Sequence, residues 1–215
     1  MLELGTKVLL AYLLGSVSGS LLIGKLKGGV DIRELGSGNA GGTNAFRTQG
    51  KMFALGVVII DVGKGYLSAA FIPVLAIVGL AQDSAVGREW LVMACASAVV
   101  IGHCYPFWHG FQGGKGAATL IGTLIYIQPA ILLPVIAIWV LVVMLSGYVG
   151  LATVMAGFSA PVYLLLTGQM ADQPLMTLAI SMAVFLVYTH RENIRRLKAG
   201  TEARVGQLAI FRRDS

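Results

Sequence analysis

Two short segments of this chain combine glycine with side chains that can bind an anion. The first spans residues 37–47, and its hydrogen-bonding side chains are Ser37, Asn39, Thr43, Asn44 and Arg47. Small neutral donors and exposed backbone N–H groups suit a phosphate, which an arginine can hold through two parallel hydrogen bonds. The alternative is an ordinary turn that caps a helix starting near Thr43, because turns use the same residue types.

The second segment, Gly113-Gly114-Lys115-Gly116, precedes a helix predicted to start at Ala117. The N–H groups of a helix N-terminus together with a lysine form a natural phosphate site. The segment is not a Walker A motif, because His109 and Gly116 stand where that motif has its first glycine and its Ser or Thr. An ATPase is therefore disfavoured.

Three further polar clusters lie in or beside apolar sequence. Asp61 and Lys64 lie within an apolar run, where an ion pair and a substrate contact are equally good interpretations. His103 and His109 lack the remaining ligands of a metal site, so we expect His103 to make a structural hydrogen bond and to position the glycine segment. In the third cluster, residues 189–197, a helix would place His190 and Asn193 on one face. A basic membrane-anchoring tail would explain the arginines of that cluster but not this pair.

The elements that position these residues are apolar helices. The chain of 215 residues is 56% hydrophobic and 12% charged, with a mean hydropathy of +0.79, which is typical of a polytopic, all-α integral membrane protein. The net charge of +6 is concentrated in short loops and the tail. This distribution follows the positive-inside rule and disfavours a nucleic-acid partner. With only Cys95 and Cys104, we expect no disulfide framework, and we expect the first apolar run to be a retained helix.

Seven membrane crossings fit the charge pattern best. Apolar segments run at about 4–24, 53–80, 90–108, 117–128, 130–145, 150–168 and 174–189. The stretch 117–145 is either one long span or two short ones broken at Gln128-Pro129. Only the break leaves loop 25–51, the Lys115 loop and the basic tail all on the cytoplasmic side, with the N-terminus outside. Six crossings, or five with a re-entrant piece, are the alternatives. We expect one domain over residues 1–215, with a variable tail from about residue 206.

Four motifs in register resemble the bacterial acyl-phosphate:glycerol-3-phosphate acyltransferase (PlsY) family. They are Ser37-Gly38-Asn39-x-Gly41-x-Thr43-Asn44-x-x-Arg47, Asp61-x-x-Lys64-Gly65, Gly102-His103-x-x-Pro106 leading into Gly113-Gly114-Lys115-Gly116, and His190-Arg191-x-Asn193-Ile194. The resemblance covers nearly the whole chain. It implies a bacterial inner-membrane enzyme whose active site faces the cytoplasm.

The resemblance also implies a reaction and a site. A fatty acyl group would pass from acyl-phosphate to the 1-hydroxyl of glycerol-3-phosphate, giving lysophosphatidic acid and phosphate, with no acyl-CoA, metal or other cofactor. The residues that would hold the phosphate-bearing substrates are Ser37, Arg47, Lys115, His190 and Asn193. Those that would line or support the site are Gly113, Gly114, Gly116, Asn39, Thr43, Asn44 and Lys64.

The residues themselves are compatible with this chemistry. Phosphate is a good leaving group from an acyl-phosphate, so the protein has chiefly to position the reactants and offset developing charge. The His-x4-Asp dyad of other glycerolipid acyltransferases is absent, since Trp108, Gly114 and Arg195 stand five residues after the three histidines. Either His190 or a substrate phosphate oxygen would accept the hydroxyl proton.

Three other functions fit the sequence less well. A transporter of an organic phosphate is the alternative, but it would be expected to have internal repeats or more polar residues at membrane depth. A non-catalytic membrane scaffold would not explain two glycine-rich loops with several donors each. A CDP-alcohol phosphotransferase would need an Asp-rich metal cluster, and only Asp61 lies near a span.

Overall fold

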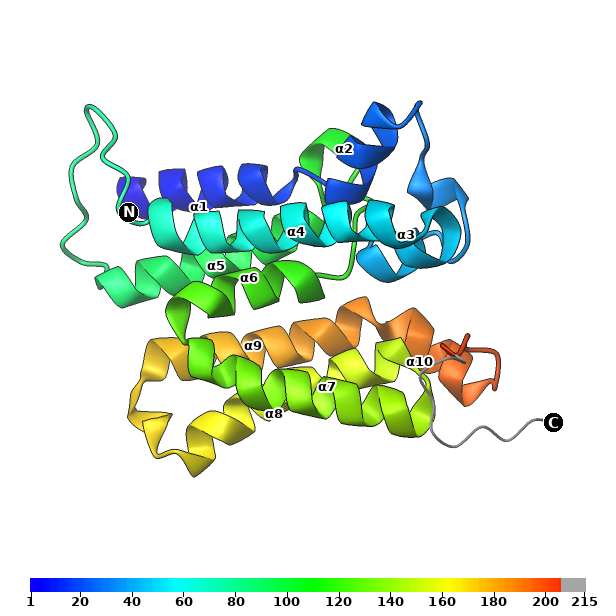
Figure 1. Ribbon diagram of the computed structural model, residues 1–215. Coiled ribbons are helices and arrows are strands. Elements are labelled where there is room, and N and C mark those ends of the chain that lie inside the picture. Colours follow the sequence, from blue (N-terminus) through cyan, green and yellow to red (C-terminus); the bar gives the residue numbers. More distant parts are fainter. Residues whose placement is uncertain (206–215) are drawn as a thin grey trace. The chain divides into compact units, whose positions relative to one another are not determined.

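Residues 1–205, which the computed structural model describes, contain helices and connecting loops but no strand (Figure 1). The predicted all-α class is therefore confirmed for this part of the chain. The predicted tail from about residue 206 lies outside the described residues. The chain divides into two compact units, Met1–Ile127 and a second that begins at Gln128.

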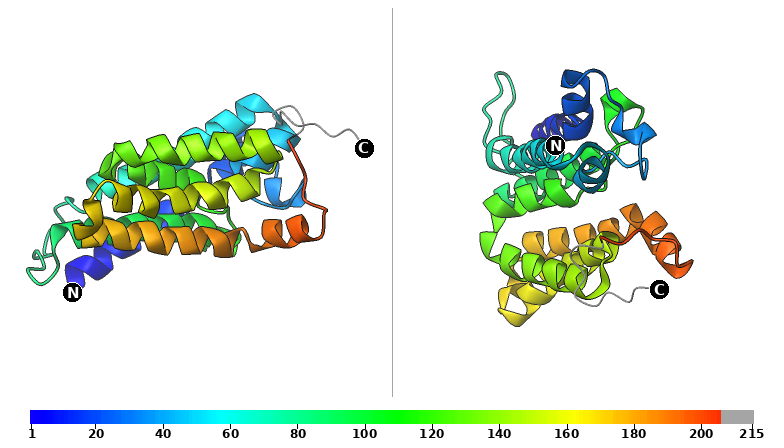
Figure 2. Two further views of the ribbon diagram at one scale, coloured as in Figure 1. Left: turned by 90° about the horizontal axis from the view of Figure 1, so that it is seen from below. Right: turned by 45° about the vertical axis from the view of Figure 1, so that its right-hand side comes forward.

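The first unit contains both glycine-rich loops. Its helices are α1 (Leu2–Gly15), α2 (Gly19–Leu26), α3 (Gly42–Gln49), α4 (Lys51–Phe71), α5 (Arg88–Cys104) and α6 (Ala117–Ile127). Helix α1 packs on α5, and α4 packs on both α5 and α6 (Figures 1 and 2). A Cβ added at Gly15 would overlap the Val99 carbonyl, and one added at Gly102 would overlap the Tyr12 carbonyl. Glycine at these two positions therefore lets α1 and α5 approach backbone to backbone.

The first apolar segment, predicted as one helix over 4–24, is broken. Helix α1 ends at Gly15, α2 begins at Gly19, and the two are bent by 45°. The Ser18 side chain caps α2 by accepting a hydrogen bond from the Leu21 N–H at 3.5 Å. The two glycines at the ends of this break contact different helices, since Gly15 lies against α5 and Gly19 against the Val57 carbonyl of α4.

The second unit is a helical hairpin followed by two further helices. It contains α7 (Leu132–Ser146), α8 (Val149–Leu166), α9 (Gln173–Thr189) and α10 (Arg191–Lys198). A short 3-10 helix, Pro129–Ile131, separates α6 from α7, so the predicted break at Gln128-Pro129 is confirmed. Helix α8 packs against both α7 and α9.

Several helices are long and apolar enough to cross a membrane. Among residues 1–205 there are four such spans: Lys51–Phe71, Arg88–His109, Pro129–Ser146 and Val149–Leu166. The bent pairs α1–α2 and α9–α10 raise the number to as many as six. Helix α6 has 11 residues and is shorter than the roughly 20 that a crossing needs. The number seven therefore stays a prediction.

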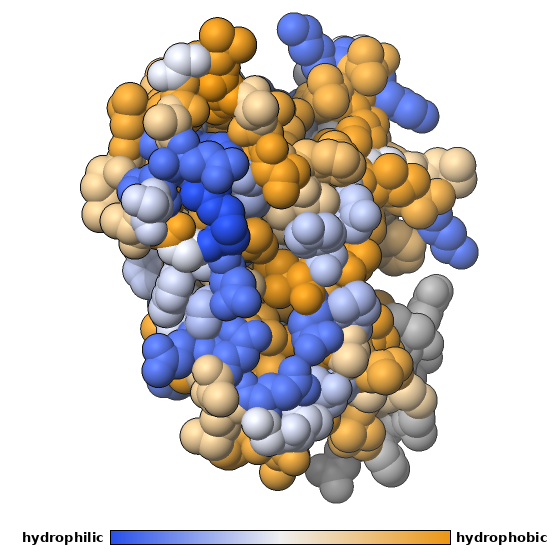
Figure 3. Space-filling view, turned by 90° about the vertical axis from the view of Figure 1, so that its left-hand side faces the viewer, coloured by the Kyte–Doolittle hydropathy of each residue, from blue (hydrophilic) through white to orange (hydrophobic). Residues whose placement is uncertain are grey.

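Apolar side chains face outward along these helices, as expected for a lipid-facing surface. Leu133 is 76% exposed and Val184 is 60% exposed. Hydrophilic patches lie among apolar ones on the face that carries the N-terminus (Figure 3). At this end Glu3 is buried and accepts hydrogen bonds from Lys7 at 2.9 Å and from Arg88 at 2.7 Å. These contacts join the start of α1 to the start of α5.

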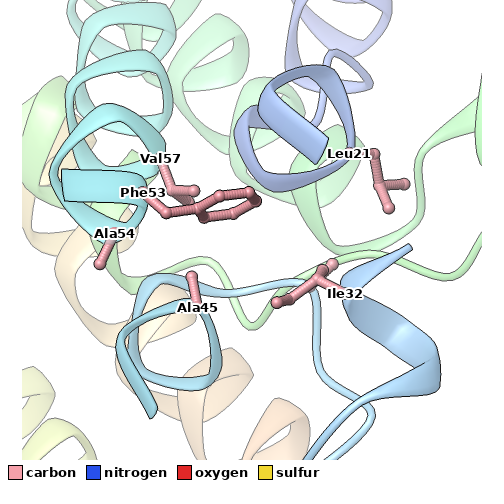
Figure 4. Packing of buried hydrophobic residues seen from close by; sticks show 7 residues of the cluster. Leu21, Ile32, Ala45, Phe53, Ala54 and Val57 are labelled. Carbon is pink, nitrogen blue, oxygen red and sulfur yellow. The ribbon is translucent and has the colours of Figure 1, made fainter. Parts of the chain in front are cut away.

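A buried apolar cluster supports the loop that carries the first motif. Its members are Leu21, Ile32, Ala40, Ala45, Phe53, Ala54 and Val57. The Phe53 ring projects from α4 into the space bounded by α2, α3 and the 31–36 segment (Figure 4). Ser20 also donates a hydrogen bond to the Ala40 carbonyl at 2.8 Å. The loop is thus anchored by packing and is not a free linker.

Candidate active site

Asn44 holds the first loop in shape. Its buried side-chain amide donates to the carbonyls of Ile32 at 3.0 Å, Leu35 at 2.9 Å and Asn39 at 3.0 Å. Its Oδ1 accepts a hydrogen bond from the Ser37 N–H at 2.9 Å. These contacts leave the Asn44 side chain turned toward its own loop, so in this structure it shapes the loop and does not present donors outward.

The other polar side chains of the first loop face outward. Ser37, Thr43 and Arg47 are exposed, and Asn39 is half-buried. The loop runs directly into α3, which begins at Gly42, as the helix-capping alternative predicted. The two interpretations are compatible, because a turn held by a buried amide can still present a hydroxyl and a guanidinium to a ligand.

The second glycine loop is folded against the end of α5. The Gly113 N–H donates to the Cys104 carbonyl and the Gly114 N–H donates to the His103 carbonyl, both at 3.1 Å. These two amides are therefore used within the protein. Gly116 has a φ of +92°, a conformation that favours glycine, and α6 begins at the next residue, as predicted. Lys115 is half-buried between these glycines.

Asp61, Lys64 and His103 form a buried cluster beneath this loop. The Lys64 ammonium lies 3.0 Å from Asp61 Oδ1 and 2.9 Å from His103 Nδ1. It also donates to the carbonyls of Gly15 at 2.9 Å and Val17 at 2.6 Å, which the break between α1 and α2 leaves without helical partners. The predicted ion pair is confirmed, and so is the structural hydrogen bond of His103.

Arg33 joins the two loops, and the sequence analysis did not identify it. Its Nη1 donates to the carbonyls of His109 at 2.9 Å and Gln112 at 3.4 Å, while Nε and Nη2 bind the Asp31 carboxylate. The hydrogen bond from Arg33 lowers the pKa of Asp31 below its ordinary value, and the same contact raises the pKa of Arg33. The sequence signal that could have identified Arg33 was an Asp-x-Arg pair in a glycine-rich loop.

His190 lies at the bend between α9 and α10. The two helices are bent by 54°, with His190 as the residue between them, so it does not share one continuous helix with Asn193 as predicted. The His190 side chain is buried, and its Nδ1 lies 2.9 Å from the Leu186 carbonyl. Because a carbonyl only accepts, Nδ1 carries a hydrogen, and Nε2 has the lone pair whenever the ring is neutral.

Asn193 lies close to a carboxylate that the sequence analysis also missed. The Asn193 amide donates to Glu202 Oε1, and Arg196 Nε donates to Glu202 Oε2 at 2.7 Å. Asn193 also packs on Gly150, at the start of α8, where a Cβ would lie 2.9 Å from its amide nitrogen. Glu202 thus fixes Asn193 from the segment that follows α10.

The segment after α10 folds back on the α7–α8 turn. The Arg204 guanidinium lies over the Tyr148 ring, 4.9 Å from its centroid, and donates to the Tyr148 hydroxyl at 2.9 Å. The Val205 N–H donates to the Gly147 carbonyl at 2.9 Å. These contacts hold Glu202 beside α10.

The candidate residues thus fall into two groups. The first unit contains Ser37, Asn39, Thr43, Asn44, Arg47, Lys64, Gly113, Gly114, Lys115 and Gly116, and the second contains His190 and Asn193. Arg33 brings the two loops of the first unit to one end of it. Within residues 1–205, no group of three or more His, Cys, Asp or Glu residues is placed to hold a metal ion.

Comparison with known proteins gives one consistent result. Residues 6–200 match the family model described as glycerol-3-phosphate acyltransferase. The glycerol-3-phosphate acyltransferase of Aquifex aeolicus (strain VF5) is 38% identical over 197 residues, which cover 92% of this chain and 96% of the relative. That of Bordetella petrii (strain ATCC BAA-461 / DSM 12804 / CCUG 43448) is 39% identical over 203 residues, which cover 93% and 92%.

Solved structures agree with this result. The crystal structure of PlsY (YgiH), an integral membrane glycerol 3-phosphate acyltransferase, in its glycerol 3-phosphate form is similar with a TM-score of 0.80 and 36% identity. The match covers 95% of this chain and 96% of the other. The lysophosphatidic acid form of the same protein matches with a TM-score of 0.79. From its membrane-type helices, its four motifs and these matches over nearly its whole length, the chain belongs to the glycerol-3-phosphate acyltransferase family.

Proposed function

We propose that this chain transfers a fatty acyl group from acyl-phosphate to the 1-hydroxyl of glycerol-3-phosphate, releasing lysophosphatidic acid and phosphate. The observation that carries the acyl transfer is the match to the acyltransferase family over residues 6–200, together with relatives solved in glycerol 3-phosphate and lysophosphatidic acid forms. Acyl-phosphate as the donor is supported by the motif resemblance and by the two phosphate-type loops, since both substrates would then carry a phosphate.

In the first unit, the exposed donors of the two loops hold the phosphate groups. Arg47 and Lys115 supply positive charge, and Ser37 and Thr43 supply neutral hydrogen bonds. Asn44 and Lys64 act through the loops, because their polar atoms are engaged by backbone and side-chain partners. Asn39 and the glycines at 113, 114 and 116 give the loops their shape.

In the second unit, His190 and Asn193 act on the acceptor. The Nδ1–H of His190 is oriented by the Leu186 carbonyl, which leaves the lone pair of a neutral ring on Nε2. Such a nitrogen can accept the proton of the glycerol-3-phosphate hydroxyl as its oxygen attacks the acyl carbonyl. The carbon–oxygen bond to phosphate then breaks, and phosphate departs with the bonding electrons. A substrate phosphate oxygen is the alternative proton acceptor.

The proposed setting is the bacterial inner membrane, crossed seven times with the N-terminus outside. The cytoplasmic side would then carry both loops and the basic tail, where they would attract a small soluble dianion. The acyl tail of the donor would remain among lipid-facing helices, and its phosphate would lie at the interface. Cysteine substitutions at loop positions, labelled from either side of sealed vesicles, test this topology.

The reaction is tested by measuring phosphate release from purified, lipid-solubilised protein given palmitoyl-phosphate and glycerol-3-phosphate. We expect release that needs both substrates and is lost in Lys115→Ala. Activity with palmitoyl-CoA alone would still support an acyltransferase, but it would overturn acyl-phosphate as the acyl donor. Absence of transfer by folded protein, with uptake of an organic phosphate into vesicles, would favour the transporter.

The role of His190 has its own test. His190→Ala should abolish turnover while glycerol-3-phosphate and palmitoyl-phosphate still bind, if this ring accepts the proton. Loss of binding with turnover per bound substrate retained would instead assign His190 a positioning role. In that case a substrate phosphate oxygen takes the proton.

A further inference from the structure

Three aromatic rings lie exposed on the turn that leads from α5 into the glycine loop. Phe107 is 54% exposed, Trp108 is 58% exposed and Phe111 is 55% exposed. The Phe107 ring makes edge-to-face contacts with the other two, with its centroid 5.1 Å from that of Trp108 and 6.1 Å from that of Phe111. The three side chains therefore form one continuous apolar surface, the aromatic platform, and are not isolated exposed residues.

The backbone at Phe111 is strained. Within the described part of the chain, Phe111 is the one residue other than glycine with a positive φ, which is +60°. A bulky side chain adopts this left-handed conformation only where its surroundings impose it, and such residues gather at functional sites. The chain thus accepts strain at a phenylalanine that is more than half exposed. Contact of this ring with water would add a second cost, so we expect its surroundings to be apolar.

Hydrogen bonds hold the turn that carries the rings in place. The Phe107 N–H donates to Ser16 Oγ at 3.1 Å, and the Phe111 N–H donates to the Pro106 carbonyl at 3.0 Å. Arg33 donates to one backbone carbonyl before Phe111 and to one after it. The rings cannot fold inward, away from their exposed positions, without breaking several of these hydrogen bonds.

The aromatic platform lies at the end of a membrane-type helix. The apolar span Arg88–His109 includes α5 and the short 3-10 helix Phe107–His109, so the rings are at the C-terminal end of this span. Aromatic side chains are enriched at the boundary between lipid headgroups and acyl chains, where a ring buries its apolar body. The place of the platform in the chain therefore suits the lipid interface better than bulk water. The glycine loop follows at once, beginning at Gly113.

We propose that the aromatic platform inserts into the boundary between the headgroups and acyl chains of the bilayer phospholipids, and so holds the glycine loop at the depth of the lipid headgroups. The phospholipid chains supply the apolar surroundings that the strained, exposed Phe111 requires. The inference goes beyond the proposed reaction, because insertion of the rings does not depend on which molecule the glycine loop binds. It also holds for either orientation of the chain across the membrane.

Trp108 reports its own surroundings by fluorescence. Substituting Trp90 and Trp139 by phenylalanine leaves Trp108 as the single tryptophan of the chain. The full chain is reconstituted into phosphatidylcholine vesicles whose acyl chains carry bromine, a contact quencher, either near the headgroup or near the chain end. We expect bromine near the headgroup to quench Trp108 more strongly than bromine near the chain end. Iodide dissolved in the buffer should quench Trp108 only weakly.

Trp139 provides a depth control in the same protein. It lies in the middle of α7, an apolar helix long enough to cross the membrane together with the short 3-10 helix before it. A chain in which Trp139 is the single tryptophan should therefore show the opposite order, with stronger quenching by bromine near the chain end. The same order of quenching for Trp108 and Trp139 would overturn the assignment of the platform to the headgroup boundary.

Three other results would overturn the proposal. Strong quenching of Trp108 by iodide with weak quenching by either bromolipid would place the rings in water. Protection of Trp108 from both kinds of quencher would place protein over the platform, such as a second copy of this chain. Bromine quenching that saturating palmitoyl-phosphate removes would assign the surface to the acyl chain of the donor and not to the bilayer.

Two substitutions at Phe111 separate its apolar ring from its backbone conformation. Asparagine accepts a positive φ more readily than most residues, so Phe111→Asn relieves the strain while it removes the ring. We expect this variant to unfold at the same temperature as the parent protein or higher, with weaker bromolipid quenching and stronger iodide quenching of Trp108. Phe111→Leu keeps an apolar side chain and should retain the quenching pattern of the parent. Equal quenching of Trp108 in the two variants would contradict insertion through Phe111.

Discussion

Arg33 Nη1 donates a hydrogen bond to the His109 carbonyl oxygen at 2.9 Å across 76 positions of sequence. The same guanidinium is held by Asp31, which pairs with it at 2.7 Å. The contact places the first loop beside the turn that leads into the glycine loop. The relative positions of the proposed phosphate-binding residues on the two loops of the first unit therefore depend on Arg33, a residue outside all four motifs.

Replacing Arg33 by lysine should loosen this connection. A lysine cannot bind a carboxylate and two carbonyls with one rigid fork, so we expect a loss of roughly 1–3 kcal/mol in unfolding free energy and a drop of about tenfold in kcat/KM for glycerol-3-phosphate. Arg195→Lys is the control, because its pair with Glu192 is 76% exposed on the arginine side and should contribute under about 1 kcal/mol. Equal effects of the two substitutions would contradict the bridging role.

The Asp31–Arg33 pair should make stability depend on acid pH. Because the folded-state pKa of Asp31 is lowered, its contribution is fully present above the ordinary carboxyl pKa of about 4 and is lost as the pH falls through the lower, folded-state value. The difference in unfolding free energy between wild type and Asp31→Asn should therefore be constant near neutral pH and shrink in acid. A difference in unfolding free energy that is unchanged in acid would contradict a stabilising role of the Asp31–Arg33 pair.

Asn44→Asp tests whether the buried amide shapes the first loop. The change replaces a donor to three carbonyls by a carboxylate oxygen, so buried acceptors would face each other. We expect a loss of about 2–4 kcal/mol in unfolding free energy and a matching loss of activity at physiological temperature. Gln49→Glu in the same helix makes the same chemical change at a partly exposed position and should cost under about 1 kcal/mol. Thermal unfolding in detergent compares the two.

Gly114→Ala should disrupt the glycine loop. The new methyl group would overlap His103 Nε2, which is fixed by Lys64 and cannot easily move aside. We expect loss of most acyl transfer and faster thiol labelling of Cys104, which is buried beneath Gly116 of this loop. Gly63→Ala in α4 has no atom within 4 Å of the added methyl group, so it should retain activity and gain up to about 1 kcal/mol in stability. Normal kinetics in Gly114→Ala would show that the loop does not need this close approach.

Glu202→Gln tests the support of Asn193. The glutamine keeps an oxygen for the Asn193 amide but loses the charge that binds Arg196, so we expect roughly a 1–3 kcal/mol loss in stability and a several-fold lower kcat. Glu202 is 6% exposed, whereas Glu192 is 52% exposed, which makes Glu192→Gln the control. Steady-state kinetics compare the two variants, and equal kcat values would contradict the supporting role of Glu202.

Most of the helices and the break at Pro129 could be predicted from apolar runs and a single proline, because both signals are local in the chain. The break after Gly15 could not be predicted in the same way. It is stabilised by Lys64, whose ammonium donates hydrogen bonds to the carbonyls of Gly15 and Val17 from nearly 50 positions away in the sequence. The bend at His190 was likewise missed, since the sequence across it continues to favour a helix.

The motif residues were identified by type and spacing, but their individual roles were not. Asn44 and Arg47 belong to one motif, yet one is buried in backbone hydrogen bonds and the other is exposed. Arg33 and Glu202 carry no distinctive spacing, and their importance comes from partners that the fold brings near them. Glu202 reaches Asn193 only because the chain reverses after α10.

By itself, the sequence determined that the chain is helical, membrane-embedded and equipped with two loops that suit phosphate. These properties follow from composition and from local patterns of glycine, charge and apolar residues. Only the tertiary structure decided that Lys64 pairs with Asp61 and His103, and that Glu202 supports Asn193. Pairing of polar groups depends on distances between helices far apart in sequence, and no local pattern specifies those distances.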